Sequence, residues 1–235
     1  MANLLARDAS GQSERSEVPR TRSKPGERRK FTKERPPDPH GVETPWRLFI
    51  AIPIPQPVLD RMEKIVTKLG GKEWPVRWVD PKTAHLTIHF IGDVDSAQAE
   101  LLRLALPGVV AKHQAFSLQT GRLGVFPNAK KPRVLWMGLD GESERLTALY
   151  DDLANLLTGY DLEVEARPYA PHITLGRLRE DISQARGMEI WTTMRGYETG
   201  APLDLPVDEV ILIRSFINRD GTRHEPLVRA KLAKL

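Results

Sequence analysis

The strongest constraint on how this chain folds comes from two short segments with the same alternation of side chains. Residues 84–90 read AHLTIHF and residues 170–178 read APHITLGRL, and each places an apolar residue between a histidine and a threonine. Thr87, Ile88 and Phe90 belong to the branched and aromatic types that favour a β-strand. Both segments are therefore predicted to be strands, and their leading histidines lie 87 residues apart.

The first segment also has the histidine spacing of an H-E-x-x-H zinc helix, so a helical alternative has to be weighed. That motif needs a glutamate after its first histidine, and the residue here is Leu86. In a strand, His85 and His89 stand on the order of 13 Å apart, too far to share one metal ion. We therefore expect no metal and no other cofactor.

A regular strand sends alternate side chains to opposite faces. In the first segment the polar side chains fall on one face: His85, Thr87 and His89. The apolar side chains fall on the other: Leu86, Ile88 and Phe90. His172 and Thr174 likewise share a face, whereas Arg177 falls on the opposite one unless the strand bulges or ends near Gly176. Each segment thus offers one imidazole and one hydroxyl, which fits two related lobes that face one cleft.

Composition narrows the class of protein. A chain of 235 residues with 40% hydrophobic content is long enough to bury a full core. No apolar run approaches the roughly 20 residues that span a bilayer, and the N-terminus lacks the apolar segment of a secretory signal. The chain has no cysteine, which excludes disulfides and thiolate chemistry and suits a reducing compartment. We expect a cytoplasmic, monomeric protein without membrane contact.

The first 45 residues differ from the rest of the chain. They are rich in Ser, Pro, Gly and charge, and they carry 10 Lys and Arg against 7 Asp and Glu, which is +3 of the net charge of +4. Such a segment buries too little apolar surface to offset its ordering entropy. Residues 1–45 are predicted to be a disordered basic arm. It is either a solvated extension or an electrostatic contact for RNA through its basic cluster: Arg28, Arg29, Lys30 and Lys33.

Residues 46–235 are predicted to form the folded domain. Apolar runs and turn residues predict further strands at 47–54, 76–79, 116–123, 133–139, 207–217 and 225–232. Apolar residues at helical spacing predict helices at 57–69, 97–106 and 143–157. Mixed strands and helices with antiparallel hairpins indicate the α+β class.

Several ordered stretches around both motifs resemble the 2H phosphoesterases, named for two H-x-[TS]-x motifs. The resemblance is to RNA 2′,3′-cyclic phosphodiesterases, also called 2′-5′ RNA ligase-like proteins. It rests on RLFIAI, WVDPKTAHLTIHFIGDV, GVFPNAKKPRVLWMGL, RPYAPHITLGRLR and VDEVILIRSFINRDGTRHEPL, and it excludes the arm. It implies a bilobal fold of two antiparallel sheets flanked by helices, with a central groove and a pseudo-two-fold duplication. It also implies metal-independent hydrolysis of an RNA 2′,3′-cyclic phosphate to a 2′-phosphate, with 2′-5′ ligation in some relatives.

Opening a cyclic phosphodiester with water requires one group that takes a proton and one that gives a proton, and two imidazoles suit both tasks. The resemblance makes His85 the proton donor and His172 the base, an assignment that the sequence itself leaves open. Thr87 and Thr174 would donate hydrogen bonds to phosphate oxygens. The resemblance adds Arg177 as a further phosphate contact.

Other residues receive weaker expectations. Tyr169 is placed either to stack on a base or to serve the core or rim. His89 is expected either at the rim of the groove or behind the residues that touch substrate. Structural roles are expected for Phe49, Phe126, Arg133 and the tryptophans Trp74, Trp78 and Trp136. No role is assigned to His40, His113 or His224. Two other functions stay open: a non-catalytic nucleotide- or RNA-binding module, and a phosphodiesterase for small cyclic nucleotides or 2′-5′ oligonucleotides.

Overall fold

The computed structural model describes residues 45–179, 182–218 and 221–234. The predicted arm lies outside the described residues except for Pro45, so its disorder stays a prediction. The first strand begins at Trp46. None of the helices in the described part of the chain is long and apolar enough to cross a membrane.

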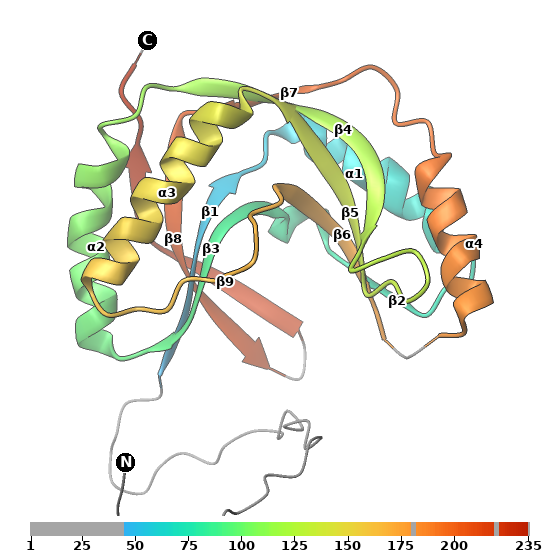
Figure 1. Ribbon diagram of the computed structural model, residues 1–235, viewed down its shortest axis with the longest axis horizontal. Helices are drawn as coiled ribbons and strands as arrows, with labels where there is room; N and C mark the ends of the chain where they lie inside the picture. The colour runs from blue at the N-terminus through green and yellow to red at the C-terminus, as the bar shows by residue number, and fades with distance from the viewer. Residues whose placement is uncertain (1–44, 180–181, 219–220, 235) are drawn as a thin grey trace, which may run out of the picture. The chain divides into compact units, whose positions relative to one another are not determined.

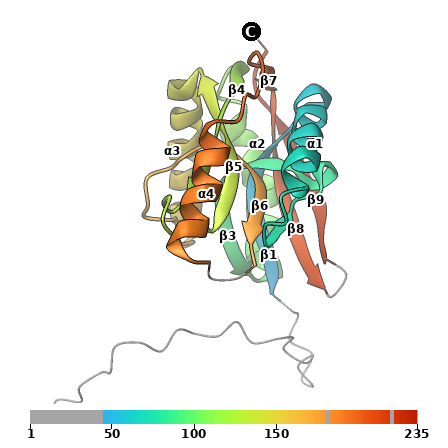
Figure 2. The same cartoon turned by 90° about the vertical axis from the view of Figure 1, so that its right-hand side faces the viewer.

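The described strands form one antiparallel sheet (Figures 1 and 2). They are β1 (Trp46–Pro53), β2 (Val76–Trp78), β3 (His85–Val94), β4 (Phe116–Phe126), β5 (Val134–Gly141), β6 (His172–Leu178), β7 (Asp204–Val207), β8 (Glu209–Asn218) and β9 (Gly221–Lys231). The order is β7-β4-β5-β6-β3-β1-β8-β9, and β2 pairs with β6. The α+β class is confirmed.

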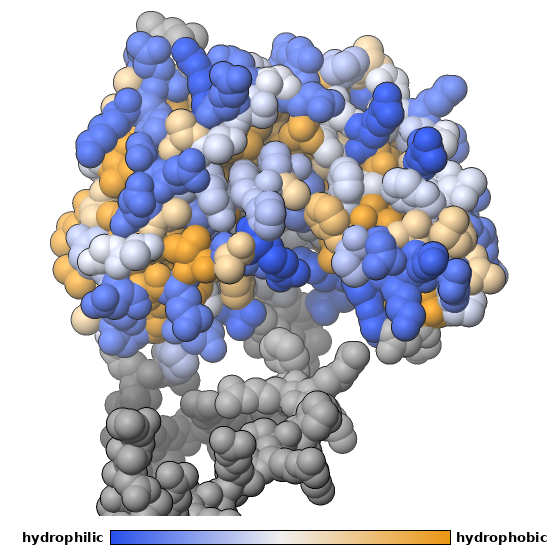
Figure 3. Space-filling view, viewed as in Figure 1, coloured by the Kyte–Doolittle hydropathy of each residue, from blue (hydrophilic) through white to orange (hydrophobic). Residues whose placement is uncertain are grey.

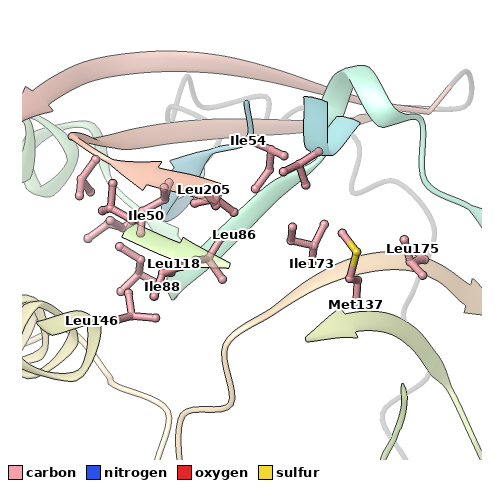
Figure 4. Packing of buried hydrophobic residues seen from close by; sticks show 14 of the residues in the cluster. Ile50, Ile54, Leu86, Ile88, Leu118, Met137, Leu146, Ile173, Leu175 and Leu205 are labelled. Carbon is pink, nitrogen blue, oxygen red and sulfur yellow. The ribbon is translucent and has the colours of Figure 1, made fainter. Parts of the chain in front are cut away.

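The two expected sheets are joined edge to edge. The joint is between β3 and β6, and it consists of the single pair Leu86 and Ile173. Both side chains are fully buried, and Figure 4 shows them in one apolar cluster with Met137 of β5. Burial of both strands in a common core therefore brings the two edges together. The central groove and the duplication stay predictions.

Four α-helices and one short 3-10 helix lie in the described residues. They are α1 (Gln56–Gly70), η1 (Pro81–Thr83), α2 (Ser96–Val110), α3 (Ser143–Gly159) and α4 (Gln184–Arg195). Local sequence explains where two of them begin: Pro57 lies in the first turn of α1, and Asp95 and Gln98 form a capping box at α2. Each helix buries one apolar stripe.

The helices pack on the two halves of the sheet. Helix α2 contacts β1, β8 and β9, and α3 contacts both α2 and β3. Helix α4 contacts β4 in the other half, and α1 contacts β2 and η1. These contacts cover the apolar face of the strands, so the polar residues of β3 and β6 are left on the opposite face. Helix α4 and strand β7 were not predicted from the sequence.

Candidate active site

The joint between β3 and β6 brings the two H-x-T segments together. Because Leu86 pairs with Ile173 in an antiparallel ladder, Thr87 lies opposite His172, and His85 lies opposite Thr174. The two histidines occupy a diagonal of this square, a separation of roughly 7–8 Å between backbone positions. A phosphate group fits between two side chains that start that far apart.

Both imidazoles are held in the same way. Nδ1 of His85 lies 2.9 Å from the Thr83 carbonyl oxygen, and Nδ1 of His172 lies 2.7 Å from the Ala170 carbonyl oxygen. A carbonyl oxygen can only accept, so Nδ1 must be the protonated nitrogen in each ring. Nε2 of each ring is then free to take a proton when the ring is neutral, or to give one when it is charged.

Aromatic rings pack against both histidines. The Phe49 ring centroid lies 4.7 Å from that of His85. Phe126 meets the edge of His172 at 5.0 Å, and Trp136 lies 6.4 Å from the same ring. The residues expected to be structural therefore fix the orientation of the two imidazoles directly.

The surroundings lower the pKa of both imidazoles and so favour their neutral forms. Burial lowers the pKa of His85 to about 4, and the positive charges of His224 and Arg177 act in the same direction. Burial also lowers the pKa of His172, again with a contribution from Arg177. Each bond to a backbone carbonyl opposes this shift, but desolvation is the larger effect.

The central pocket has a volume of about 500 Å³, and its lining includes His85, Thr87, Thr174, Arg177, Thr222 and His224. His172 does not line this pocket, although it is two residues from Thr174 on β6. In Figure 3, hydrophilic residues occupy the middle of the visible face, between α3 and α4, with hydrophobic patches to either side. The pocket thus unites four of the six predicted site residues.

A β-bulge turns Arg177 toward this pocket. Leu135 pairs with Gly176 and Trp136 with Thr174, so Leu175 is the extra residue in β6. The bulge reverses the alternation, and Arg177 shares a face with His172 and Thr174. The regular alternation would have placed it on the opposite face.

A second arginine, missed by the sequence reasoning, faces Arg177. Arg77 of β2 is its direct partner across the ladder, and both arginines line the central pocket. Like charges in directly opposite positions repel one another. Within the described part of the chain, neither guanidinium has a carboxylate partner. A bound anion would relieve this repulsion.

His89 is not at the rim of the groove, so that alternative is wrong, and a position behind the residues that touch substrate stays a prediction. Ile88 is an extra residue in β3, because Ile50 pairs with His89 and Ala51 with Thr87. The bulge turns His89 into the core, where it is 3% exposed. It also turns Phe90 outward to 48% exposure, opposite to the face predicted for it.

The core position of His89 connects it to two tyrosines. Its Nε2 lies 2.8 Å from the Tyr150 carbonyl oxygen, and its ring stacks on that of Tyr150 at 4.1 Å. Tyr150 in turn stacks on Tyr169 at 4.4 Å. The Tyr169 hydroxyl donates a hydrogen bond of 3.0 Å to the Thr87 carbonyl oxygen, and burial raises its pKa. One face of Tyr169 is therefore occupied, and the residue supports the backbone of Thr87.

Tyr169 lines a different hollow from the central pocket. This hollow of about 630 Å³ lies between α3 and residues 164–171. The other five predicted site residues do not line it. Stacking of Tyr169 on a base stays a prediction.

His224 lies at the central pocket, although the sequence assigned it no role. Its ring centroid is 5.2 Å from that of His85 and 5.1 Å from that of Phe49. His224 lies on β9, which pairs with β8, and β8 pairs with β1, the strand that carries Phe49. No local signal in the sequence marks a residue that reaches the site through two successive strand pairings.

The residues of the site are those of acid-base chemistry. Among the described residues, no group of three or more His, Cys, Asp and Glu side chains is placed to hold a metal ion. One fixed imidazole, two threonines and two arginines line the central pocket, and the second fixed imidazole, that of His172, is two residues from Thr174 on β6. Together these groups can hold a phosphate and move protons on both sides of it. The expectation of a metal-independent reaction stays a prediction.

The fold and this pocket define a protein of the two-histidine phosphoesterase class. The chain belongs to the 2′-5′ RNA ligase superfamily, whose sequence pattern matches residues 48–216. The RNA 2′,3′-cyclic phosphodiesterase of Thermotoga maritima is 32% identical over 133 residues, which cover 57% of this chain and 70% of the relative. The protein of the same name from Aeropyrum pernix is 24% identical over 176 residues, 75% of this chain and 97% of the relative.

A solved structure is similar over most of the chain. The crystal structure of E. coli LigT complexed with 3′-AMP is 25% identical in sequence, with a TM-score of 0.58. It covers 80% of this chain and 98% of LigT. The resemblance found in the two H-x-T segments is thereby confirmed.

Proposed function

We propose that the protein hydrolyses the 2′,3′-cyclic phosphate at the end of an RNA or nucleotide and leaves a 2′-phosphate. The observation that supports this most directly is the pair of imidazoles. In each ring Nδ1 is bound to a carbonyl oxygen, and Nε2 has no hydrogen-bond partner among the described residues. The names of the relatives from Thermotoga maritima and Aeropyrum pernix agree with this activity. The 3′-AMP bound to LigT is a nucleotide with a phosphate at the sugar edge.

The reaction needs one neutral and one protonated imidazole. Nε2 of the neutral ring takes a proton from water, and the water oxygen attacks phosphorus. The bond from phosphorus to the 3′ oxygen breaks, and that oxygen takes a proton from Nε2 of the other ring. The base ring gains one proton and the donor ring gives one up, so the total charge of the two rings does not change. Proton exchange with solvent then restores the starting protonation state of each ring.

The assignment of His85 as donor and His172 as base follows the family. It requires that the negative charge of the bound phosphate raise the pKa of His85 from its value of about 4. Thr87 and Thr174 would donate hydrogen bonds to the non-bridging oxygens. Arg177 and Arg77 would neutralise the charge that develops there.

The test uses cyclic-phosphate substrate, EDTA and three histidine variants. We expect the wild-type protein to form a 2′-phosphate in EDTA, and His85→Ala and His172→Ala each to lower kcat/KM by about 10²- to 10⁴-fold. His113→Ala is the matched control, because His113 pairs with Asp152 at 3.0 Å and does not line the central pocket. Absence of product, or equal turnover by all variants, would reject the proposal.

The same variants separate the acid from the base. A substrate with sulfur at the 3′ bridging position has a leaving group that departs without protonation. We expect this substrate to restore turnover to His85→Ala and not to His172→Ala. Restoration of His172→Ala instead would reverse the assignment.

The other functions have distinct outcomes in these assays. A phosphodiesterase for small cyclic nucleotides or 2′-5′ oligonucleotides would have its highest kcat/KM on those substrates. A binding module would bind cyclic-phosphate and 2′-5′ oligonucleotides without turning over any of them. Joining of RNA ends through a 2′-5′ linkage is a transfer at the same phosphorus, and it would appear as a longer product. The monomeric state and the cytoplasmic location stay predictions.

A further inference from the structure

A second hollow, which we call the side pocket, adjoins the central pocket. It has a volume of about 470 Å³. Five residues line both pockets: Thr83, Ala84, His85, Thr222 and His224. The two spaces are therefore neighbours across one wall, and each is within the range of roughly 300–1,000 Å³ that is usual for sites of small ligands.

The floor of the side pocket is apolar. Ala51, Ile211 and Ile213 line it, and with Phe49 they form a buried cluster separate from the main core. These residues project from β1 and β8 on the face that carries His85. The flat side of a nucleobase is the kind of group that stacks on such a floor next to a histidine ring.

The rim of the side pocket is basic. Lys82, Arg223 and Arg229 line it, and no Asp or Glu does. Arg229 binds Glu209 at 2.7 Å, and Arg223 lies 3.3 Å from Glu225. Lys82 forms no ion pair within the described part of the chain and is exposed. Its ammonium group is available to a phosphate.

From this arrangement we propose that the side pocket binds the nucleotide that precedes the cyclic phosphate in an RNA chain. The terminal nucleotide occupies the central pocket, the preceding base lies on the floor of Ala51, Ile211 and Ile213, and a phosphate of that nucleotide contacts Lys82. The preferred substrate is then an oligonucleotide end, not a cyclic mononucleotide. This inference rests on the proposed function.

His224 separates the two sites in this arrangement. Its ring meets His85 at an interplanar angle of 73° and Phe49 at 69°, so both contacts are T-shaped. The wall between the central pocket and the side pocket thus includes an aromatic side chain that packs against two other rings. A base in the side pocket would contact the wall that also positions His85.

The test compares three substrates that share one terminal nucleoside: a cyclic mononucleotide, a cyclic-phosphate dinucleotide, and the same dinucleotide without its upstream base. We expect kcat/KM for the dinucleotide to exceed that for the mononucleotide at least about fivefold, and removal of the base to abolish most of this gain. This comparison leaves the protein unchanged, so folding does not affect it.

A charge reversal tests the rim. We expect Lys82→Glu to lower the ratio of dinucleotide to mononucleotide kcat/KM several-fold. Lys112→Glu, the same change at an exposed residue that lines neither pocket, is expected to leave the ratio unchanged. Equal kcat/KM for mononucleotide and dinucleotide in the wild type would overturn the proposal, as would a gain that survives both base removal and Lys82→Glu.

A binding measurement separates this inference from the proposed function. The affinities for a 3′-phosphorylated mononucleotide and dinucleotide are measured by calorimetry, which needs no turnover. Tighter binding of the dinucleotide without hydrolysis of any cyclic phosphate would support the side pocket and reject the phosphodiesterase. Equal affinities together with hydrolysis would reject the side pocket alone.

Discussion

At the scale of single residues, the site depends on neighbours that fix two imidazoles and lower their pKa values. The two H-x-T motifs were found from sequence because a histidine and a threonine two positions apart share a strand face regardless of what surrounds the strand. The neighbours could not be found in this way. His224 and Arg77 reach the pocket through pairings between strands. A short segment of sequence does not show which strands will pair with each other.

Replacement of His224 tests how strongly that residue affects His85. His224→Gln removes a group whose charge lowers the pKa of His85, whereas the larger cause, burial, is left in place. We therefore expect the pKa of His85 to rise above about 4 and to stay below 6.5. The measurement is an NMR titration of the two imidazoles. His172 serves as the internal reference, because its pKa is lowered by burial and by Arg177, not by His224. An unchanged pKa of His85 would show that His224 has no electrostatic effect on it.

At the scale of elements, the sequence predicted most strands and helices but not their irregularities. The bulges at Ile88 and Leu175 each lie three residues after a site histidine. A strict alternation does not account for an inserted residue, and it therefore misplaced His89 and Phe90. It allowed Arg177 on the face of His172 only if the strand bulged or ended near Gly176, and a bulge is present there. Strand β7 is four residues long and contains a proline, and only Gly187, Ile190 and Met194 are buried in α4, so neither gives a strong periodic signal.

The pairing of β4 with β5 supplies a test at this scale. A Cβ atom added at Gly124 would lie 2.2 Å from the ring of Trp136, and Trp136 packs near His172. We expect Gly124→Ala to destabilise the fold by about 1–3 kcal/mol and to lower kcat/KM as His172 loses its support. Urea unfolding and steady-state kinetics measure the two effects.

Gly108 in α2 is the matched control for that change. A Cβ atom added there meets nothing within 4 Å, so Gly108→Ala is expected to leave activity unchanged and to stabilise the helix slightly. Wild-type stability and activity in Gly124→Ala would contradict the packing described for Trp136.

At the scale of the whole molecule, four partly or fully buried histidines make stability depend on pH. Burial lowers the pKa values of His85, His89, His172 and His224. The unfolded chain therefore binds more protons than the folded chain below about pH 6.5. Their contribution to stability is complete above that pH and is lost as the pH falls toward the folded values, near pH 4 for His85.

This dependence gives a prediction for the intact protein. The shift of His85 from 6.5 to about 4 corresponds to a loss of up to about 3 kcal/mol of unfolding free energy between neutral pH and pH 4. We expect His85→Asn to show a smaller loss over the same range, as measured by urea unfolding at several pH values. The same slope in both proteins would be incompatible with a depressed pKa for His85.

The single pair at the joint of β3 and β6 has a mechanical consequence. Most neighbouring strands in this sheet are joined by several residue pairs. The two halves of the sheet that carry His85 and His172 are joined by one pair, Leu86 with Ile173. Two strands joined by one residue pair resist twisting less than two strands joined by many pairs. The imidazoles of His85 and His172 lie on the two sides of this pair. The distance between the two imidazoles thus depends on how rigidly the apolar core residues pack beneath the pairing of β3 with β6. A small change in those core residues would shift the imidazoles relative to each other.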